Sequence, residues 1–195
     1  MLSITLTKPD LSQLVIPPLR RTPSSHCWTG RPFGPPIAFV LHTQAGGESG
    51  TVAEFLNSAS QFSTHYSARL DGSLDCYVDP RDRAWCNGVL EPGNRWAALA
   101  ECCHVDPVLN PNHVTVSCET EDDGDPDQPV TEAQYNAVLY AAWEAKRRFP
   151  ETLRYLVRHA DISPQSRTHC PGDRWLASGY FHKLAESLGL ETLGD

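Results

Sequence analysis

The side chains best suited to catalytic chemistry in this 195-residue chain are a few imidazoles and thiols. His159 follows an apolar, strand-like run at residues 153–157, and Cys170 stands in the loop beyond it, directly before a Pro-Gly pair. His42 closes a second apolar run, at residues 37–41. Imidazole and thiolate bind zinc well at neutral pH, and a hydrolytic zinc site needs three protein ligands and one position open to water. His42, His159 and Cys170 are therefore candidate ligands of one zinc ion.

The elements that must position these side chains follow from the spacing of apolar residues. The pattern predicts strands over residues 37–41, 63–70, 74–78, 114–119 and 153–157, and helices over residues 51–59, 94–103, 131–149 and 173–188. An Asp71-Gly72 pair between two of these strands is a strong hairpin signal. Strands and helices interleave, so we expect an α/β fold: a single domain with a central mixed β-sheet flanked by helices. Ligands at strand ends would converge at one edge of such a sheet.

The clearest helix is the one predicted over residues 131–149. Thr131 and Gln134 have the spacing of a capping box, in which each side chain bonds to the other residue's backbone N–H. Pro150 directly follows the pattern and ends the helix. Both ends of this helix are therefore encoded locally.

The N-terminal segment differs in composition from the rest of the chain. Seven of the 16 prolines lie within residues 1–36. Proline disfavours helix interiors and central strands, so this segment is predicted to be an extended arm packed on the core. The catalytic domain is then expected to span residues 37–195.

The overall composition excludes several classes of protein. The formal net charge is −8, which argues against a nucleic-acid-binding protein. The longest apolar run, residues 37–41, is far short of the roughly 20 residues that cross a bilayer, so no membrane span is expected. The N-terminus lacks the apolar segment of a signal peptide. The seven cysteines are odd in number and include no C-x-x-C pair, so we expect reduced thiols.

One acidic stretch, residues 119–127, raises the question of a calcium site. Its carboxylates do not have the spacing of an EF-hand. Charge runs of this kind are usually solvated, so the stretch is predicted to be a surface loop.

Five blocks of sequence, taken in order, point to one protein family. They are Phe39-Val40-Leu41-His42-Thr43, then Ser63-Thr64-His65-Tyr66 with Asp71-Gly72, then Arg83-Ala84-Trp85-Cys86-Asn87-Gly88, then residues 112–119, then Arg158-His159-Ala160-Asp161-Ile162-Ser163 with Thr168-His169-Cys170-Pro171-Gly172. Together the blocks resemble the zinc-dependent N-acetylmuramoyl-L-alanine amidases of type 2. That superfamily includes phage amidase endolysins and the peptidoglycan recognition proteins, and the resemblance covers roughly residues 37–185.

The resemblance implies a role for each matched residue. The ligands of the single Zn²⁺ would be His42, His159 and Cys170. Tyr66 would lie beside the metal and orient the water or the substrate carbonyl. Glu119 would be the general base, and Thr168, two residues before the last ligand, would stabilise the oxyanion.

Three positions depart from the family pattern. Cys86 replaces a histidine that is not a ligand in the family, so this thiol either adds a soft ligand or fills space. His169 stands beside Cys170 and is an alternative third ligand. Ala160 replaces the usual arginine, which removes one ion pair.

The function that the resemblance implies is hydrolysis of the amide between N-acetylmuramic acid and L-alanine in peptidoglycan. The compact chain is most similar to a phage or prophage endolysin, which waits in the host cytoplasm and reaches the wall after the membrane is breached. The expected partner is a peptidoglycan or muropeptide substrate, with no nucleic acid, and a monomer is favoured.

Three other functions remain open from the sequence. A cytosolic recycling amidase is the nearest variant, although that branch of the family tends to have aspartate as third ligand. A non-catalytic peptidoglycan-binding module would typically lack the cysteine. A cysteine–histidine hydrolase would use Cys170 as nucleophile, and it would need this thiol at a helix N-terminus beside a base.

Overall fold

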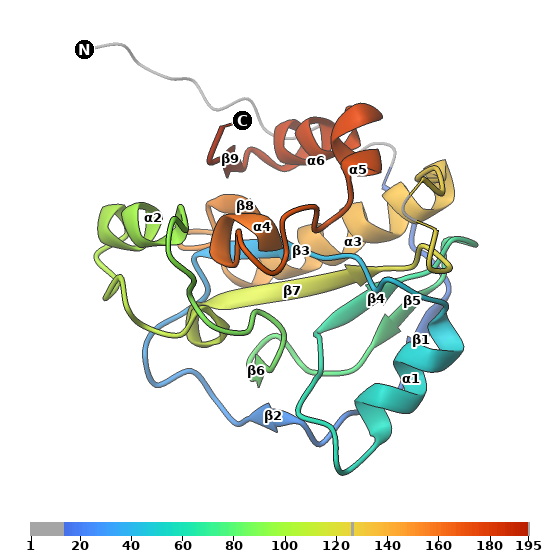
Figure 1. Ribbon diagram of the computed structural model, residues 1–195, viewed down its shortest axis with the longest axis horizontal. Coiled ribbons are helices and arrows are strands. Elements are labelled where there is room, and N and C mark those ends of the chain that lie inside the picture. Colours follow the sequence, from blue (N-terminus) through green and yellow to red (C-terminus); the bar gives the residue numbers. More distant parts are fainter. Residues whose placement is uncertain (1–13, 126, 195) are drawn as a thin grey trace.

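A seven-stranded mixed sheet carries the fold (Figure 1). The computed structural model describes residues 14–125 and 127–194 of the chain. In chain order its elements are β1 (Leu19–Arg21), β2 (Cys27–Trp28), β3 (Ala38–Leu41), α1 (Glu48–Leu56), β4 (Tyr66–Ala68), β5 (Leu74–Cys76), β6 (Arg83–Ala84), α2 (Trp96–Cys102), the 3-10 helix η1 (Pro111–Val114), β7 (Thr115–Thr120), α3 (Glu132–Arg148), β8 (Tyr155–Arg158), α4 (His159–Ile162), α5 (Asp173–Ala177), α6 (Tyr180–Leu188) and β9 (Glu191–Thr192).

The strand order is β1-β5-β4-β7-β3-β8-β9. β3 lies between β7 and β8 and runs parallel to both, while β4 is antiparallel to β5 and parallel to β7. All four residues of β3 are fully buried, as a central parallel strand covered on both faces requires. The α/β prediction with a mixed central sheet is confirmed.

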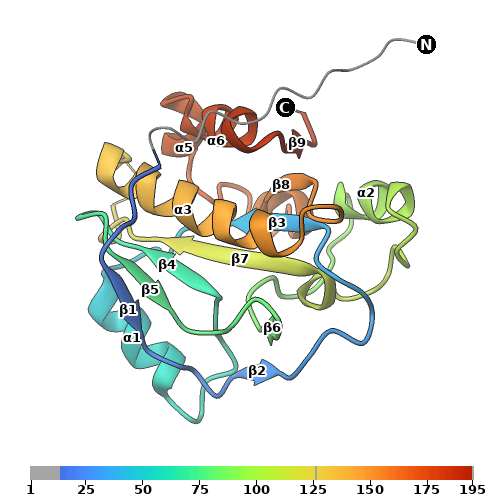
Figure 2. The same cartoon turned by 180° about the vertical axis from the view of Figure 1, so that it is seen from behind.

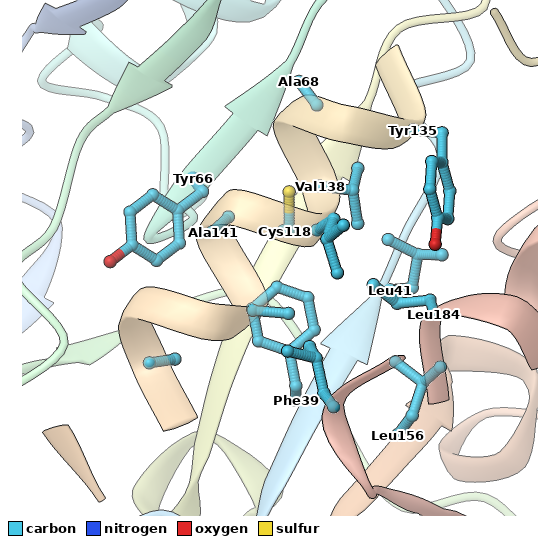
Figure 3. Packing of buried hydrophobic residues seen from close by; sticks show 14 of the residues in the cluster. Phe39, Leu41, Tyr66, Ala68, Cys118, Tyr135, Val138, Ala141, Leu156 and Leu184 are labelled. Carbon is cyan, nitrogen blue, oxygen red and sulfur yellow. The ribbon is translucent and has the colours of Figure 1, made fainter. Parts of the chain in front are cut away.

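Helices cover both faces of this sheet, as the two opposite views show (Figures 1 and 2). One face packs on α3, α5 and α6, through a core that includes Phe39, Leu41 and Cys118 (Figure 3). The other face packs on α2 and α4, through residues that include Val40. Successive strand residues point to opposite faces. His42, two residues after Val40, is therefore directed to the α4 side of the sheet.

The predicted Asp71-Gly72 hairpin is confirmed as the turn between β4 and β5. Gly72 has φ +85°, and a Cβ at this position would lie 2.8 Å from Cβ of Ala133 in α3. Glycine is needed here both for the backbone conformation and for the close approach of the helix.

Helix α1 begins at Glu48, three residues before the predicted start at Thr51. The cause is a distant side chain, because Oε1 of Glu121 accepts a hydrogen bond of 2.9 Å from the backbone N–H of Glu48. Its Oε2 accepts from the N–H of Leu70. In the acidic stretch, Glu121 thus fixes two neighbouring segments. The prediction that residues 119–127 form a surface loop is wrong at its start, because β7 extends to residue 120 and Glu119 is buried. Among the described residues, Glu119 belongs to one of the two groups with metal-binding geometry, and residues 120–125 belong to neither.

The ends of α3 agree closely with the prediction. Thr131 caps the helix, and its hydroxyl accepts from the N–H of Gln134. The reciprocal half of the capping box is absent, because Nε2 of Gln134 donates to the carbonyls of Ala68 and Glu121 instead. Gln134, predicted to take part in the capping box, therefore connects α3 to the sheet through its side chain.

The single C-terminal helix predicted over residues 173–188 is wrong, because the structure has two helices there. α5 ends at Ala177 and α6 begins at Tyr180, with Gly179 between them in the left-handed region at φ 73°. The change of direction lets α6 pack its apolar face on α3.

The proline-rich segment is extended where the structure describes it, from residue 14 onward. It also contributes to the sheets: β1 pairs in parallel with β5 at the edge, and β2 pairs with β6. The part of the predicted arm over residues 1–13 lies outside the described residues. Within the described part of the chain, no helix is long and apolar enough to cross a membrane.

Candidate metal centre

Three side chains from distant parts of the chain meet at the end of β3. In the parallel pair of β3 and β8, Leu41 is opposite Arg158, so the next residues, His42 and His159, emerge side by side. Cys170 approaches from the loop before α5. One ligand atom from each of His42, His159 and Cys170 lies within 4.8 Å of the others. The structure thus brings together the three predicted ligands.

Asn87 sets the orientation of both imidazoles. Nε2 of His42 lies 3.0 Å from Oδ1 of Asn87, and Nε2 of His159 lies 3.1 Å from its backbone carbonyl oxygen. The amide of Asn87 is itself fixed, because Nδ2 donates to Oγ1 of Thr115 at 2.8 Å. Both Nε2 atoms must therefore donate, since an oxygen of this kind only accepts. Each neutral imidazole then presents an Nδ1 lone pair, and the two Nδ1 atoms face each other at 3.0 Å.

Burial keeps these imidazoles neutral, which is the form that binds a metal. Burial lowers the pKa of His42, and the adjacent His159 lowers it further. Burial lowers the pKa of His159 to about 4. Two lone pairs in contact without a proton between them repel each other, and a cation between them would remove that repulsion. The donor set therefore fits a metal ion.

Cys170 completes the donor set. Its Sγ accepts from the backbone N–H of Thr43 at 3.3 Å, a contact that favours the thiolate. Burial nevertheless raises the pKa of the Cys170 thiol, and the nearby Glu119 raises it further. A bound cation would reverse this balance, because coordination deprotonates a thiol.

Glu119, the last-but-one residue of β7, lies beside the same cluster. Its Oε1 is 3.8 Å from Nδ1 of His42 and accepts from Sγ of Cys86 at 3.5 Å. Its Oε2 is buried and has no hydrogen-bond partner among the described residues. Burial raises the pKa of Glu119 to about 8. Because burial favours the neutral form of both groups, His42 and Glu119 are not an ion pair in the metal-free protein.

A cleft of about 780 Å³ opens onto this cluster. Beyond the cluster, its walls come from the loop after β3, from α1 and from the loop before α5, and they include Thr43, Gly46, Phe55, Phe62, Asp122, Arg167 and Thr168. A site of this size with a few converging polar groups is typical of a small-molecule binding site.

Comparison with known proteins agrees with this geometry. Residues 32–173 match the model of the family Amidase_2, described as N-acetylmuramoyl-L-alanine amidase. The chain belongs to this amidase family. A search of curated proteins finds none that matches the chain.

Solved structures that are similar to this chain include amidases. A selenomethionine derivative of AmpD aligns with a TM-score of 0.67 and 22% identity, over 87% of this chain and 96% of that one. The amidase LysC from Clostridium intestinale URNW aligns with a TM-score of 0.58 and 15% identity, over 90% of this chain and 100% of that one. AmiD from E. coli was solved in complex with anhydro-N-acetylmuramic acid-L-Ala-D-gamma-Glu-L-Lys. It aligns with a TM-score of 0.57 and 21% identity, over 80% of this chain and 58% of that one. These likenesses establish the amidase fold of the chain.

Tyr66 does not lie in this candidate metal cluster, and the role predicted for it needs correction. In β4 it is opposite Cys118, and both side chains point to the α3 face of the sheet. Figure 3 shows Tyr66 among the residues packed on α3. Ser67 and Glu119, the next pair, point to the opposite face, where the cluster lies. The alternation of side chains along a strand thus excludes Tyr66 from the site.

Thr168 lines the cleft but is exposed, and its hydroxyl donates to the carbonyl of Pro164 at 3.1 Å. Arg167, its neighbour, also lines the cleft, and its positive charge lowers the pKa of both His42 and His159. Sequence reasoning did not single out Arg167. His169 is exposed and pairs with Asp173, so the structure places Cys170, and not His169, in the metal cluster.

Asn87 is the other functional residue that sequence reasoning missed. It belongs to the matched Arg83–Gly88 block, but nothing in that block showed that its amide and carbonyl would bond to two histidines. Cys86, its neighbour, is buried against Glu119.

Proposed function

We propose that the protein is a zinc-dependent N-acetylmuramoyl-L-alanine amidase that hydrolyses the amide between N-acetylmuramic acid and L-alanine of peptidoglycan. The donor geometry supports this best: two Nδ1 lone pairs and one thiol lie within 4.8 Å of one another beside a cleft. Two nitrogens, one sulfur and an open side suit tetrahedral catalytic zinc. The muropeptide in the AmiD complex, on the same fold, supports a substrate of that class.

His42, His159 and Cys170 would hold the zinc ion, which would polarise the amide carbonyl and lower the pKa of a water molecule. Glu119 is the nearest buried carboxyl group, with one oxygen free of partners. A bound cation nearby would favour the ionised form of this carboxyl group, which takes a proton from the attacking water and returns it to the leaving amine of L-alanine.

Negative charge that develops on the scissile carbonyl needs a donor or a cation nearby. Thr168 can supply its hydroxyl only by giving up the bond to Pro164. Arg167 has a fixed positive charge on the same wall of the cleft, so it supports this step together with Thr168.

The same donor set argues against a cysteine–histidine hydrolase. Gly172, two residues beyond Cys170, is the N-cap of α5, so the thiol does not lie in the first turn of that helix. The pKa of the Cys170 thiol is raised, whereas a nucleophilic thiol needs it lowered.

We further infer that the enzyme is a phage or prophage endolysin that acts from the host cytoplasm once the membrane is breached. A cysteine as third donor favours a lytic enzyme over a recycling amidase, whose third ligand tends to be aspartate. The endolysin LysCS from Clostridium intestinale URNW shares the fold.

One experiment tests bond and substrate together. Purified sacculi and soluble anhydromuropeptides are digested separately, and the products are identified by mass spectrometry. Stem peptides with a free L-alanine N-terminus are expected from both, with intact sacculi cut efficiently. Cleavage of the soluble fragments alone would contradict the endolysin and favour a recycling amidase.

Cys170→Ala and His42→Ala are expected to abolish both cleavage and zinc content, measured by atomic absorption. His169→Ala is the matched control, since this exposed histidine should be dispensable for both. A metal-free protein that still cleaves would overturn the zinc mechanism. Binding to sacculi without cleavage would identify a binding module.

A further inference from the structure

His42, Cys86 and Glu119 form a second group with metal-binding geometry, and it overlaps the first. One ligand atom of each lies within 4.8 Å of the others, and all three residues are buried. Sγ of Cys86 lies 3.5 Å from Oε1 of Glu119, which in turn lies 3.8 Å from Nδ1 of His42. Cys86 has no part in the proposed reaction.

A second observation points to a ligand at this place. Oε2 of Glu119 is buried without a hydrogen-bond partner among the described residues. An orphaned buried carboxyl oxygen is costly unless something binds it. Cys86 is only 2% exposed, but both Cys86 and Glu119 line the cleft, so a small ion in the cleft can reach them. A small cation coming through the cleft would satisfy both groups.

We propose that His42, Cys86 and Glu119 are an alternative position for a single divalent cation of borderline or soft character, such as zinc, cobalt or cadmium. The thiol selects this class, because hard cations such as Mg²⁺ prefer oxygen ligands. Nε2 of His42 is committed to Asn87, so both positions use Nδ1 of His42. An ion in one position therefore excludes an ion in the other.

The two positions differ in their chemical consequence. An ion held by His159 and Cys170 leaves Glu119 free, whereas an ion held by Cys86 has Glu119 as a ligand. If the proposed function is right, the protein with its ion bound by His42, Cys86 and Glu119 has no free proton acceptor and is inactive. Metal binding itself does not depend on the proposed function.

Cobalt is a suitable probe, because thiolate coordination gives a ligand-to-metal charge-transfer absorption that histidine and carboxylate ligands do not. The full chain, reduced and kept anaerobic, is titrated with Co²⁺ without substrate. Cys170→Ser is expected to keep a thiolate–cobalt band, now from Cys86, at a weaker affinity. Cys86→Ser with Cys170→Ser is expected to lose the band completely.

Matched variants separate Cys86 from the other thiols. Cys118 is buried next to Glu119 in sequence but faces α3, so Cys118→Ser with Cys170→Ser should keep the band. Adding His42→Ala to Cys170→Ser should remove it, because His42 is shared. Adding Glu119→Gln to Cys170→Ser should weaken cobalt binding, although the thiol of Cys86 is still present. This double variant tests the proposal even if Cys86→Ser does not fold.

The proposal is overturned if Cys170→Ser, shown to be folded by circular dichroism, gives no thiolate band. It is equally overturned if the band survives the loss of both Cys86 and Cys170. The cobalt titration needs no substrate, so a negative result does not contradict the amidase proposal. In the same way, a failed sacculus digest does not contradict the proposed alternative metal position.

Discussion

At the scale of single residues, Asn87 decides which nitrogen of each imidazole faces the cleft. Its side-chain oxygen binds one histidine and its backbone oxygen binds the other. Groups that hold metal ligands from behind commonly change metal affinity 10–100-fold when removed. The orientation of two candidate ligands thus depends on a residue outside the donor set.

Asn87→Ala is expected to weaken zinc binding by about 10- to 100-fold, because His42 loses the acceptor that fixes its orientation. Competition with a chromophoric chelator measures the affinity. Asn57→Ala, at an exposed position, is the control and should bind zinc normally. An unchanged affinity in Asn87→Ala would show that the backbone contact alone suffices.

Glu119→Gln keeps the shape of the side chain but cannot accept a proton. We expect kcat to fall by about 10²- to 10⁴-fold, the usual contribution of a general base, with zinc content unchanged. Glu54, an exposed carboxylate on the cleft wall, provides the control substitution Glu54→Gln. An unchanged kcat in Glu119→Gln would show that another group accepts the proton.

Tyr66→Phe tests the corrected position of that residue. Because the ring packs on the α3 face, we expect unchanged kcat and a free energy of unfolding within about 1 kcal/mol of the wild type. Tyr66→Ala, in contrast, should destabilise by about 3–5 kcal/mol through the cavity it leaves. Urea denaturation and a wall-digestion assay measure the two effects. A specific loss of kcat in Tyr66→Phe would contradict the structure.

At the scale of elements, His65 joins three segments before β4 begins. Its Nδ1 accepts from the N–H of Ser117 in β7, so Nε2 carries the proton and donates to the carbonyl of Asp82. Burial lowers the pKa of His65 to about 3, and the charge of Arg31 adds to this. The folded protein therefore requires the neutral imidazole.

This requirement makes stability depend on pH. Since the folded pKa lies below the ordinary value near 6.5, the stabilisation is complete above pH 6.5 and is lost as pH falls toward 3. Protonation of His65 alone should lower the free energy of unfolding by about 1.4 kcal/mol for each unit that the pH falls in that window. We expect metal-free His65→Gln to be less stable at pH 7 but to lose stability less steeply on acidification. Parallel pH curves of the two proteins, from urea denaturation, would rule out this role.

Much of the architecture could be predicted from local pattern. The buried strand at residues 37–41, the Asp71-Gly72 turn and the long helix each have signals within a few residues. The start of α1 could not be predicted, because its cap is Glu121, which lies 73 residues away. The break at Gly179 was missed because the apolar spacing continues across it.

The site divides in the same way. Residue type and position at strand ends identified His42, His159 and Cys170. The side of the sheet that a residue faces depends on register with neighbouring strands, and this is why Tyr66 was misassigned. Asn87 acts through contacts to both histidines, which only the assembled fold creates.

At the scale of the whole molecule, the three donors come from segments that are far apart in sequence, and the two histidines are 117 positions apart. A ligand that binds only the folded state stabilises it by mass action, by about 2.7 kcal/mol at 100 times Kd. Zinc removal by a chelator should therefore lower the thermal midpoint, and added zinc should restore it. Cys170→Ala should be far less responsive to either treatment; a wild-type midpoint that ignores zinc would contradict a folded-state site.

The distribution of the thiols sets the order in which oxidation would damage the enzyme. All seven cysteines are free, and oxidation proceeds fastest at exposed thiols. Cys102, at the end of α2, is exposed, whereas Cys86, Cys118 and Cys170 are buried. In an oxidising environment the surface of α2 would therefore react first, and the thiol of Cys170, the candidate sulfur donor for a metal, would be among the last to be lost.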